Sequence, residues 1–572
     1  QKTNLVSNVT PKEQDYIPVE KIEYGIIKQT DGKYVKILEV ENCEYTNLTP
    51  DRQWAMVDAF TNIYENSCIS LHIKIKSSTE DLSVFFNNVH NEQADDPNPF
   101  VQERREDYIK TSQAFVASSV KKQCYYFIFS YEGNRKNENE IYEEFDLVIN
   151  EYIESLQAIG CTVIERSFTD NDHTIECLYS SLNPKGERAE GVVKRYERVM
   201  SDYESYNIVH SEQRTASIND LICPHGLDFS IDNKYMVIDG MYETFLTIRG
   251  NSIPQELASD FVPYLLKEEC EIDIFSERIP TQKVMSNMKA GEKSKQLIST
   301  PNENSVDTTK IEDKYSYFNT LNYIRGALLN EQHYYETVIV LTFKDESLKE
   351  LKTKVDAFKQ KLGKPPLNLK FRETYCNAEE LFLMTLPLMY YKSNNEVFKL
   401  NSRGFLTSSF ASLMPFGSKD LKDTSGIIWG ISLATSGLYA INTTNRDYGF
   451  QNSNIAFVGG TGAGKSFFQM LLGTRLYLNG FGTYYVCPIK GHEYQWFAKS
   501  LNGSFINLLP QMDCINIFEI RPEVNNRYIN KPMPLLTKKI VQIISFLRLS
   551  MPQMTHEEQN KLNIALMGLY GS

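Results

Sequence analysis

Alternating apolar and polar positions predict paired strands at residues 21–29 and 33–41, because a strand with one buried face repeats every second residue. The polar residues Thr30-Asp31-Gly32 separate them, and Asp-Gly between two such runs is a strong signal for a β-hairpin. The same pattern returns at residues 235–250, around a second Asp-Gly pair. We therefore expect two similar hairpins in distant parts of the chain.

The pattern that follows each hairpin predicts the same order of elements. After the first hairpin we expect a helix at 51–65, a strand at 68–76, two helical stretches, a strand at 123–131, a helix at 138–159, a strand at 162–167 and a helix at 174–182. After the second we expect a helix at 257–267, a strand at 270–277, two helices, a strand at 337–343, a helix at 347–362, a strand at 367–371 and a helix at 377–384. A repeat after about 200 residues indicates a duplicated α+β N-terminal region, with chance similarity of common patterns as the alternative.

Polar segments separate these parts. Residues 201–219 lie between the two repeats, and residues 289–314, which are rich in Lys, Ser, Asn and Glu, predict a mobile loop between helices. Short strands interrupted by Gly and Ser are expected from about residue 400 to 445, where they would form a connector.

Composition restricts the class of protein. The chain has 572 residues, 41% hydrophobic and 23% charged, which is typical of a soluble globular protein with several domains. A net charge of −13 argues against nucleic-acid binding over the whole surface. It does not exclude a local basic channel. The ten cysteines are scattered and the eight histidines show no zinc-binding spacing, which favours a reducing, cytosolic compartment. No apolar run reaches the length of about 18 residues that a membrane span needs.

The clearest chemical signal is a glycine-rich loop. An apolar run at 454–458 predicts a central parallel strand, and Gly459-Gly460-Thr461-Gly462-Ala463-Gly464-Lys465-Ser466 follows it directly. In such a loop the backbone N–H groups surround the β-phosphate of a nucleotide. Lys465 would contact the β- and γ-phosphates, and the Ser466 hydroxyl would bind Mg²⁺.

The flanking sequence fits a β-α-β unit. Residues 467–478 have apolar positions at helical spacing, and residues 483–486 predict a second strand. An apolar run before Asp239 resembles the Mg²⁺-binding strand of such enzymes, but we assign it to the second Asp-Gly hairpin. No comparable acidic strand follows the loop, and we expect it beyond Ser572.

Further motifs accompany the loop. They are, in chain order, Ser412-Leu-Met-Pro-Phe416, Gly426-Ile-Ile-Trp-Gly430-Ile431, Pro488-Ile-Lys-Gly-His-Glu493-Tyr494, Gly503-Ser-Phe-Ile506, Asn516-Ile-Phe518 and a final helical segment at 554–570. With the loop, they resemble the large ATPase of type IV secretion and conjugation machines, the CagE/TrbE/VirB family of HerA/FtsK-type P-loop NTPases. This sequence departs from the family pattern at Cys487, where many relatives have an acid, and at Ile517, where they have a proline.

The resemblance implies a domain order. The expected parts are a first α+β module at 1–200, a linker at 201–232, a second module at 233–395, a connector at 396–450, the start of a RecA-like P-loop domain at 451–520 and the start of an all-α insertion at 521–572. It also implies ATP hydrolysis with Mg²⁺, with Lys465 as a catalytic residue and Glu493 as a candidate for organising water or magnesium. A surface acid at a helix start is the other interpretation of Glu493.

Family membership further implies a homo-hexamer at the cytoplasmic face of a cell membrane, without a transmembrane segment of its own. Its partners would be the channel and inner-membrane proteins of the same apparatus, and ATP would energise pilus assembly or substrate transfer. Two other functions stay open at this point. One is a DNA-translocating coupling protein or HerA-like ATPase, and the other is an ATP-gated scaffold that does not hydrolyse ATP.

Overall fold

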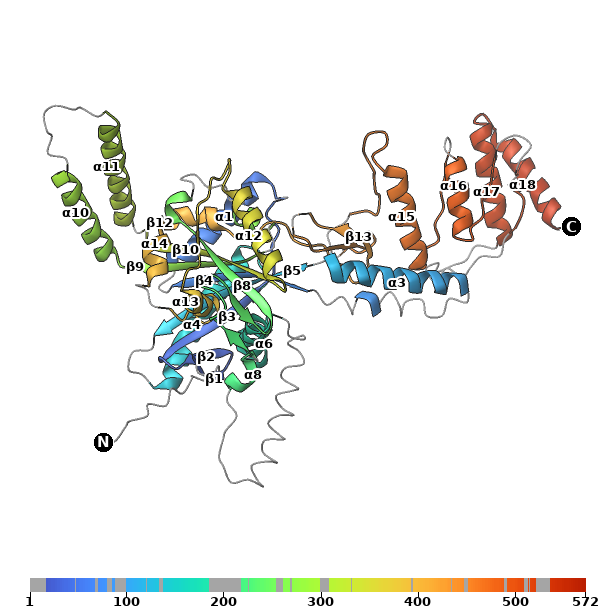
Figure 1. The fold of residues 1–572 in the computed structure, drawn as a ribbon. Helices are drawn as coiled ribbons and strands as arrows, with labels where there is room; N and C mark the ends of the chain where they lie inside the picture. Colours follow the sequence, from blue (N-terminus) through green and yellow to red (C-terminus); the bar gives the residue numbers. More distant parts are fainter. Residues whose placement is uncertain are drawn as a thin grey trace, which may run out of the picture. The chain divides into compact units, whose positions relative to one another are not determined.

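The computed structural model divides into two compact units, Gln1–Ala456 and Phe457–Ser572 (Figure 1). The described residues are 17–46, 48–66, 70–79, 85–87, 99–119, 121–132, 137–184, 218–224, 226–253, 261–267, 270–298, 308–330, 332–391, 395–433, 435–446, 451–487, 491–508, 513, 515–520 and 535–571. Within them, no helix has the length and hydropathy that would let it cross a bilayer.

A large antiparallel sheet forms the centre of the first unit. Its strands follow the order β1-β2-β3-β5-β4-β9-β10-β8-β7-β6, with β11 added beside β8 and β12 beside β10. Their bounds are β1 Val19–Glu23, β2 Ile26–Gln29, β3 Lys33–Val40, β4 Leu71–Thr79, β5 Lys121–Glu132, β6 Leu227–Asp228, β7 Met236–Ile238, β8 Met241–Ile248, β9 Glu271–Ile279, β10 Tyr334–Asp345, β11 Phe371–Glu373 and β12 Arg403–Leu406.

The strand order is the same when read from either edge. From one edge the order is β1-β2-β3-β5-β4, and from the other edge it is β6-β7-β8-β10-β9. The two orders are the same when β1 to β5 are matched with β6 to β10 in chain order. The two halves meet where β4 pairs with β9, with Ile73 opposite Ile274. Beyond the main path, Val163 forms a single bridge with Val40, at the place where β11 pairs with β8 in the other half. A duplication is expected to give this symmetry, so the strand order supports it.

Helices cover both faces of the sheet. Phe60 of α1, Phe145 of α4, Val262 of α9 and Phe358 of α12 belong to the core on one face. The core on the other face contains side chains of α6, α8, α13 and α14, including Leu178. The bounds are α1 Pro50–Asn66, α3 Pro99–Ser119, α4 Glu138–Ala158, α5 Arg166–Thr169, α6 Asn171–Leu182, α8 Ile218–Ile222, α9 Phe261–Leu266, α10 Thr281–Ile298, α11 Thr308–Leu329, α12 Leu348–Leu362, α13 Ala378–Thr385 and α14 Glu396–Asn401.

Charged side chains lie buried on the face of the sheet that α6, α8, α13 and α14 cover. Asp273 of β9 accepts hydrogen bonds from Lys74 of β4 at 3.2 and 3.3 Å, and its Oδ1 is 2.8 Å from Nε2 of His72. Lys74 is also 3.2 Å from Glu271, which receives a 3.0 Å contact from Lys344 of β10. Because these groups alternate with apolar residues of the opposite core, the sheet is apolar on one face and partly ionic on the other.

Both Asp-Gly hairpins are present. At the second one, Asp239 and Gly240 have φ values of 48° and 77°, which is the left-handed pair that a two-residue type I′ turn requires. The assignment of Asp239 to a hairpin is therefore confirmed.

Replacing Gly240 by Ala is expected to lower the free energy of unfolding by about 1–2 kcal/mol, because a Cβ disfavours a positive φ. Urea unfolding measures the change. Gly326→Ala is the control, since Gly326 lies inside α11 with open space around its Cα, and this change is expected to stabilise by about 0.5–1 kcal/mol. An equal loss in both variants would contradict the turn assignment.

Several expected elements differ from those observed. Residues 21–29 form two strands, because the chain reverses at Tyr24-Gly25, where both φ values are positive. The strand expected at 162–167 is a single bridge followed by α5, and the one expected at 367–371 is the shorter β11. The predicted loop at 289–314 is wrong for most of its length, since α10 and α11 occupy its two ends; residues 299–307 lie outside the described part. Most of the predicted linker also lies outside it.

The connector contains short elements, as expected. They are α14, β12, η3 Thr407–Leu413, β13 Ile427–Ile431 and β14 Leu438–Ile441. The Pro-Phe motif packs into the first core, where Phe416 is fully buried and its ring lies 5.3 Å from that of Tyr125. The glycine-bounded strand motif is β13, which pairs with β14.

The second unit contains helices α15 Lys465–Leu478, α16 Gly491–Ser500, α17 Leu535–Ser550 and α18 His556–Gly571. Ile540 and Ile543 of α17 pack against Leu566 of α18, which agrees with a helical segment after residue 520. The parallel strands predicted at 454–458 and 483–486 are not formed in the described structure, and no parallel sheet is seen there. A strand needs a hydrogen-bonded neighbour, and no described segment pairs with either run.

Candidate nucleotide-binding site

The glycine-rich loop turns back on itself before it enters α15. Gly462 and Gly464 have φ values of 79° and 84°, a left-handed conformation that residues with a Cβ rarely adopt. Gly464 is also the N-cap of α15, and its carbonyl accepts the first helical hydrogen bond, from Phe468 N–H at 2.9 Å. The backbone N–H groups at the start of α15 have no partner within the helix, so they are available to an anion together with the helix dipole.

Lys465 lies across the loop. Its Nζ donates hydrogen bonds to the carbonyl oxygens of Gly459 and Gly460 at 2.8 and 2.7 Å. The side chain is half-buried, as is that of the adjacent Ser466 in the first turn of α15. The ammonium group is therefore held over the loop by neutral carbonyl groups, which a phosphate oxygen can replace with a stronger, charge-assisted bond.

The two flanking segments pack on α15 although they form no ladder. The ring of Phe457 lies edge-on to Phe468 at 5.6 Å, and the Tyr485 hydroxyl donates to the Gln469 carbonyl at 3.2 Å. Tyr485 also lies against Gly473, where an added Cβ would come within 1.6 Å of its hydroxyl oxygen. The two segments and the loop are thus packed around one helix.

Glu493 is placed by α16. It lies in the first turn of this helix, next to Tyr494, whose hydroxyl donates to Gln469 Oε1 at 3.2 Å. Tyr485 packs against both Tyr494 and Phe497, each at 5.3 Å between ring centroids. These contacts hold α16 beside α15, near the turn that follows Lys465. These contacts involve Tyr494 and Phe497 and not the carboxylate of Glu493. A role of Glu493 in catalysis therefore stays a prediction.

Cys487 closes the second flanking segment. Burial raises the pKa of its thiol, so the side chain is neutral around pH 7. The Cys487 thiol therefore offers no negative charge at the position where many members of the secretion ATPase family have an acid.

The eight loop residues Gly459–Ser466 are consecutive in the chain and lead directly into α15, and their role in nucleotide binding stays a prediction. Sequence reasoning assigned no role to Gln469 or Tyr485 and included Tyr494 only as part of a motif, although these residues join α15 to its neighbouring segments. The available signal was the group of aromatic residues Tyr484, Tyr485, Tyr494, Trp496 and Phe497, which follow the loop closely.

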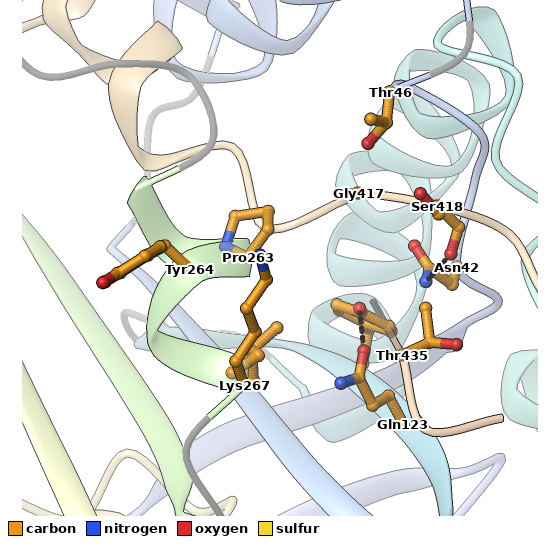
Figure 2. Close-up of a pocket in the computed structure, with 11 residues that line it drawn as sticks. Asn42, Thr46, Gln123, Pro263, Tyr264, Lys267, Gly417, Ser418 and Thr435 are labelled. Atoms are coloured by element: carbon orange, nitrogen blue, oxygen red, sulfur yellow. Dashed lines mark hydrogen bonds between the residues drawn. The ribbon is translucent and has the colours of Figure 1, made fainter. Parts of the chain in front are cut away.

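A pocket of about 130 Å³ lies in the first unit (Figure 2). Asn42 donates to the Ser418 carbonyl at 2.7 Å on one side, and Tyr125 donates to Gln123 Oε1 at 2.8 Å below it. Lys267 of the opposite wall is the one charged residue of the lining. The lining otherwise contains hydroxyl, amide and apolar groups and no carboxylate, imidazole or thiol.

Comparisons of the chain with protein-family models and with curated proteins find no match.

Proposed function

We propose that the chain binds a nucleoside triphosphate at Gly459–Ser466 and is the ATP-hydrolysing motor of a conjugative type IV secretion system. The loop geometry carries the first part of this proposal, because left-handed glycines, an exposed helix start and a lysine across the loop are the features that a phosphate group requires. The second part depends on the order of motifs from Phe416 to Phe518 and on their resemblance to the secretion ATPase family.

The residues of the loop would act on the triphosphate in different ways. Lys465 would leave the carbonyls of Gly459 and Gly460 and neutralise charge on the β- and γ-phosphate oxygens. The backbone N–H groups from Gly462 to Ser466 would bind the β-phosphate and hold the chain of phosphates in line. Mg²⁺, which Ser466 would help to hold, would supply further charge stabilisation when bound.

The proposal includes a domain architecture of two duplicated α+β modules and a RecA-like domain. The packing of Phe457 and Tyr485 on α15 supports a RecA-like β-α-β unit, and the symmetric sheet supports two duplicated α+β modules before it. Assembly as a hexamer, docking on channel and inner-membrane proteins, and a place at the cytoplasmic face of a membrane follow from the family resemblance alone. A net charge of −13 makes DNA translocation the weaker alternative.

An ATP-gated scaffold without hydrolysis is the second candidate. It is favoured by the neutral Cys487 and by the contacts of α16, which join it to α15 through Tyr494. Both candidates share the nucleotide site and differ in turnover.

Steady-state ATPase activity measured against protein concentration tests the motor proposal. For a motor that works as an assembly, the rate per chain is expected to rise with concentration and then level off, because a neighbouring subunit completes the site. Absent turnover at every concentration, combined with intact ATP binding, would contradict the motor and support the scaffold.

Ser466→Ala is expected to raise the Mg²⁺ concentration needed for half-maximal ATP binding by about tenfold, because one oxygen ligand of the ion is lost. Fluorescence of a labelled ATP analogue against Mg²⁺ concentration measures this shift. Ser500→Ala is the control, since the Ser500 hydroxyl donates to the Phe497 carbonyl at 2.7 Å within α16. An unchanged Mg²⁺ requirement in the Ser466 variant would exclude Ser466 as a ligand.

A further inference from the structure

Three potential metal ligands meet in the first unit. They are Glu39 on β3 and His173 and Cys177 on α6. His173 Nε2 is 3.2 Å from Glu39 Oε2 and 3.6 Å from Cys177 Sγ, and the three donor atoms lie within 4.8 Å of one another. His173 and Cys177 are buried, and only 13% of the Glu39 side chain is exposed.

Local structure fixes the positions of these side chains. His173 and Cys177 are four residues apart on α6, so they lie on the same face of the helix. The helix is attached to the first hairpin at Gly25, whose N–H donates to Asn171 Oδ1 at 2.7 Å and whose carbonyl accepts from Thr174 at 3.3 Å. Glu39 alternates with Leu38 and Val40 of the opposite core, and its side chain therefore points towards α6.

We propose that Glu39, His173 and Cys177 form a binding site for Zn²⁺. In a tetrahedral zinc site with bonds of about 2.0–2.1 Å to N and O and about 2.3 Å to S, neighbouring ligand atoms are about 3.3 Å (N···O) and about 3.6 Å (N···S) apart. The observed separations of 3.2 and 3.6 Å match these values.

Hydrogen bonding alone accounts for this cluster poorly. One ring nitrogen, Nε2 of His173, faces both the carboxylate and the thiol, yet it has either one proton or one lone pair to offer. A metal ion between the three donor atoms would satisfy all of them.

The cations near this cluster have partners: Lys36 donates to the carbonyls of Gly25 and Phe168, and Lys122 and Arg166 are paired with carboxylates. Lys122 is 3.7 Å from the other carboxylate oxygen of Glu39, Oε1, and the lysine side chain is 45% exposed. Arg166 is paired with Asp170 at 3.0 Å and Glu176 at 3.3 Å. A ligand set with one N, one S and one O atom favours Zn²⁺ or Co²⁺ over Mg²⁺, which prefers oxygen. The bound ion would connect α6 to the sheet and stabilise the first unit.

Titration of the full chain with Co²⁺ tests the site directly, after removal of metals with EDTA and without nucleotide. We expect one Co²⁺ per chain with a near-ultraviolet thiolate-to-cobalt charge-transfer band, displacement by Zn²⁺, and a higher melting temperature with Zn²⁺ than with EDTA. Cys177→Ser is expected to abolish the band and weaken Zn²⁺ binding by more than about 100-fold, since even supporting partners of ligands contribute about 10–100-fold.

Two matched variants make the result specific. Cys270→Ser changes another buried cysteine, on the opposite core, and is expected to keep the band. Ser466→Ala changes the nucleotide loop and is also expected to keep it, so the proposal stands or falls independently of nucleotide binding. If Cys177→Ser does not fold, Glu39→Gln serves instead and is expected to weaken Zn²⁺ binding while the thiolate band remains. A wild-type chain that shows no band, or a band that survives in Cys177→Ser, would overturn the proposal.

Discussion

Replacing Lys465 by Ala is expected to reduce ATP turnover at least about 100-fold, since removing one preorganised positive or hydrogen-bonding group that stabilises the transferring phosphate typically costs 10²–10³ in rate. In the structure the ammonium group donates to the carbonyls of Gly459 and Gly460, and the side chain is half-buried. The melting temperature without nucleotide is therefore expected to stay nearly unchanged. Phosphate release measures the first effect and thermal unfolding the second.

Lys499→Ala is the matched control for this experiment. Lys499 lies in the last turn of α16, away from the loop in sequence, and its loss is expected to leave turnover within about twofold of the parent. Full activity in the Lys465 variant would show that this lysine does not stabilise the phosphoryl group, and the motor mechanism would fail.

The largest expected effect on stability is at Asp273. Asp273→Ala is expected to lower the free energy of unfolding by about 3–5 kcal/mol, because it leaves the buried Lys74 and His72 without their common carboxylate. Burial acts to lower the pKa of Lys74, but the charges of Asp273 and Glu271 outweigh it and raise the pKa overall, so the ammonium is charged at neutral pH. Guanidinium unfolding followed by circular dichroism measures the loss.

Asp356→Ala separates this effect from the loss of any acid. Asp356 lies on α12, its side chain is 64% exposed, and it pairs with Lys359 at 2.8 Å. An exposed pair of this kind contributes less than about 1 kcal/mol. Similar losses in the two variants would mean that the buried charges are not coupled as the structure shows.

The sequence was a good guide to elements with a strong local pattern. The Asp-Gly hairpins were predictable because Gly tolerates the positive φ that such turns need, as Gly32 and Gly240 show, and the second has the Asp239–Gly240 pair of a type I′ turn. The long strands β5 and β10 and the helices α4 and α12 also follow directly from periodicity. The loop at Gly459–Ser466 could be located from sequence because eight consecutive residues define it, and its binding of a nucleotide stays a prediction.

Features that depend on distant pairing were not predictable. Nothing local indicates that β4 lies beside β9, and the lysines at 74 and 76 look like an exposed face until Asp273 and Glu271 are placed opposite them. The zinc proposal has the same origin, because Glu39 precedes α6 by more than a hundred residues and the pair His173–Cys177 matches no common zinc motif. The parallel strands expected at 454–458 and 483–486 do not form in the described structure. An apolar pattern alone does not make a strand, because a strand also needs a hydrogen-bonded partner.

Isothermal titration of the folded chain with ATP in the presence of Mg²⁺ tests nucleotide binding most directly. We predict saturable binding with one nucleotide per chain, and at least about tenfold weaker binding in Lys465→Ala, because a charge-assisted contact to the phosphates is lost. A folded chain that takes up neither ATP nor GTP under these conditions would contradict the assignment of Gly459–Ser466 as a nucleotide site.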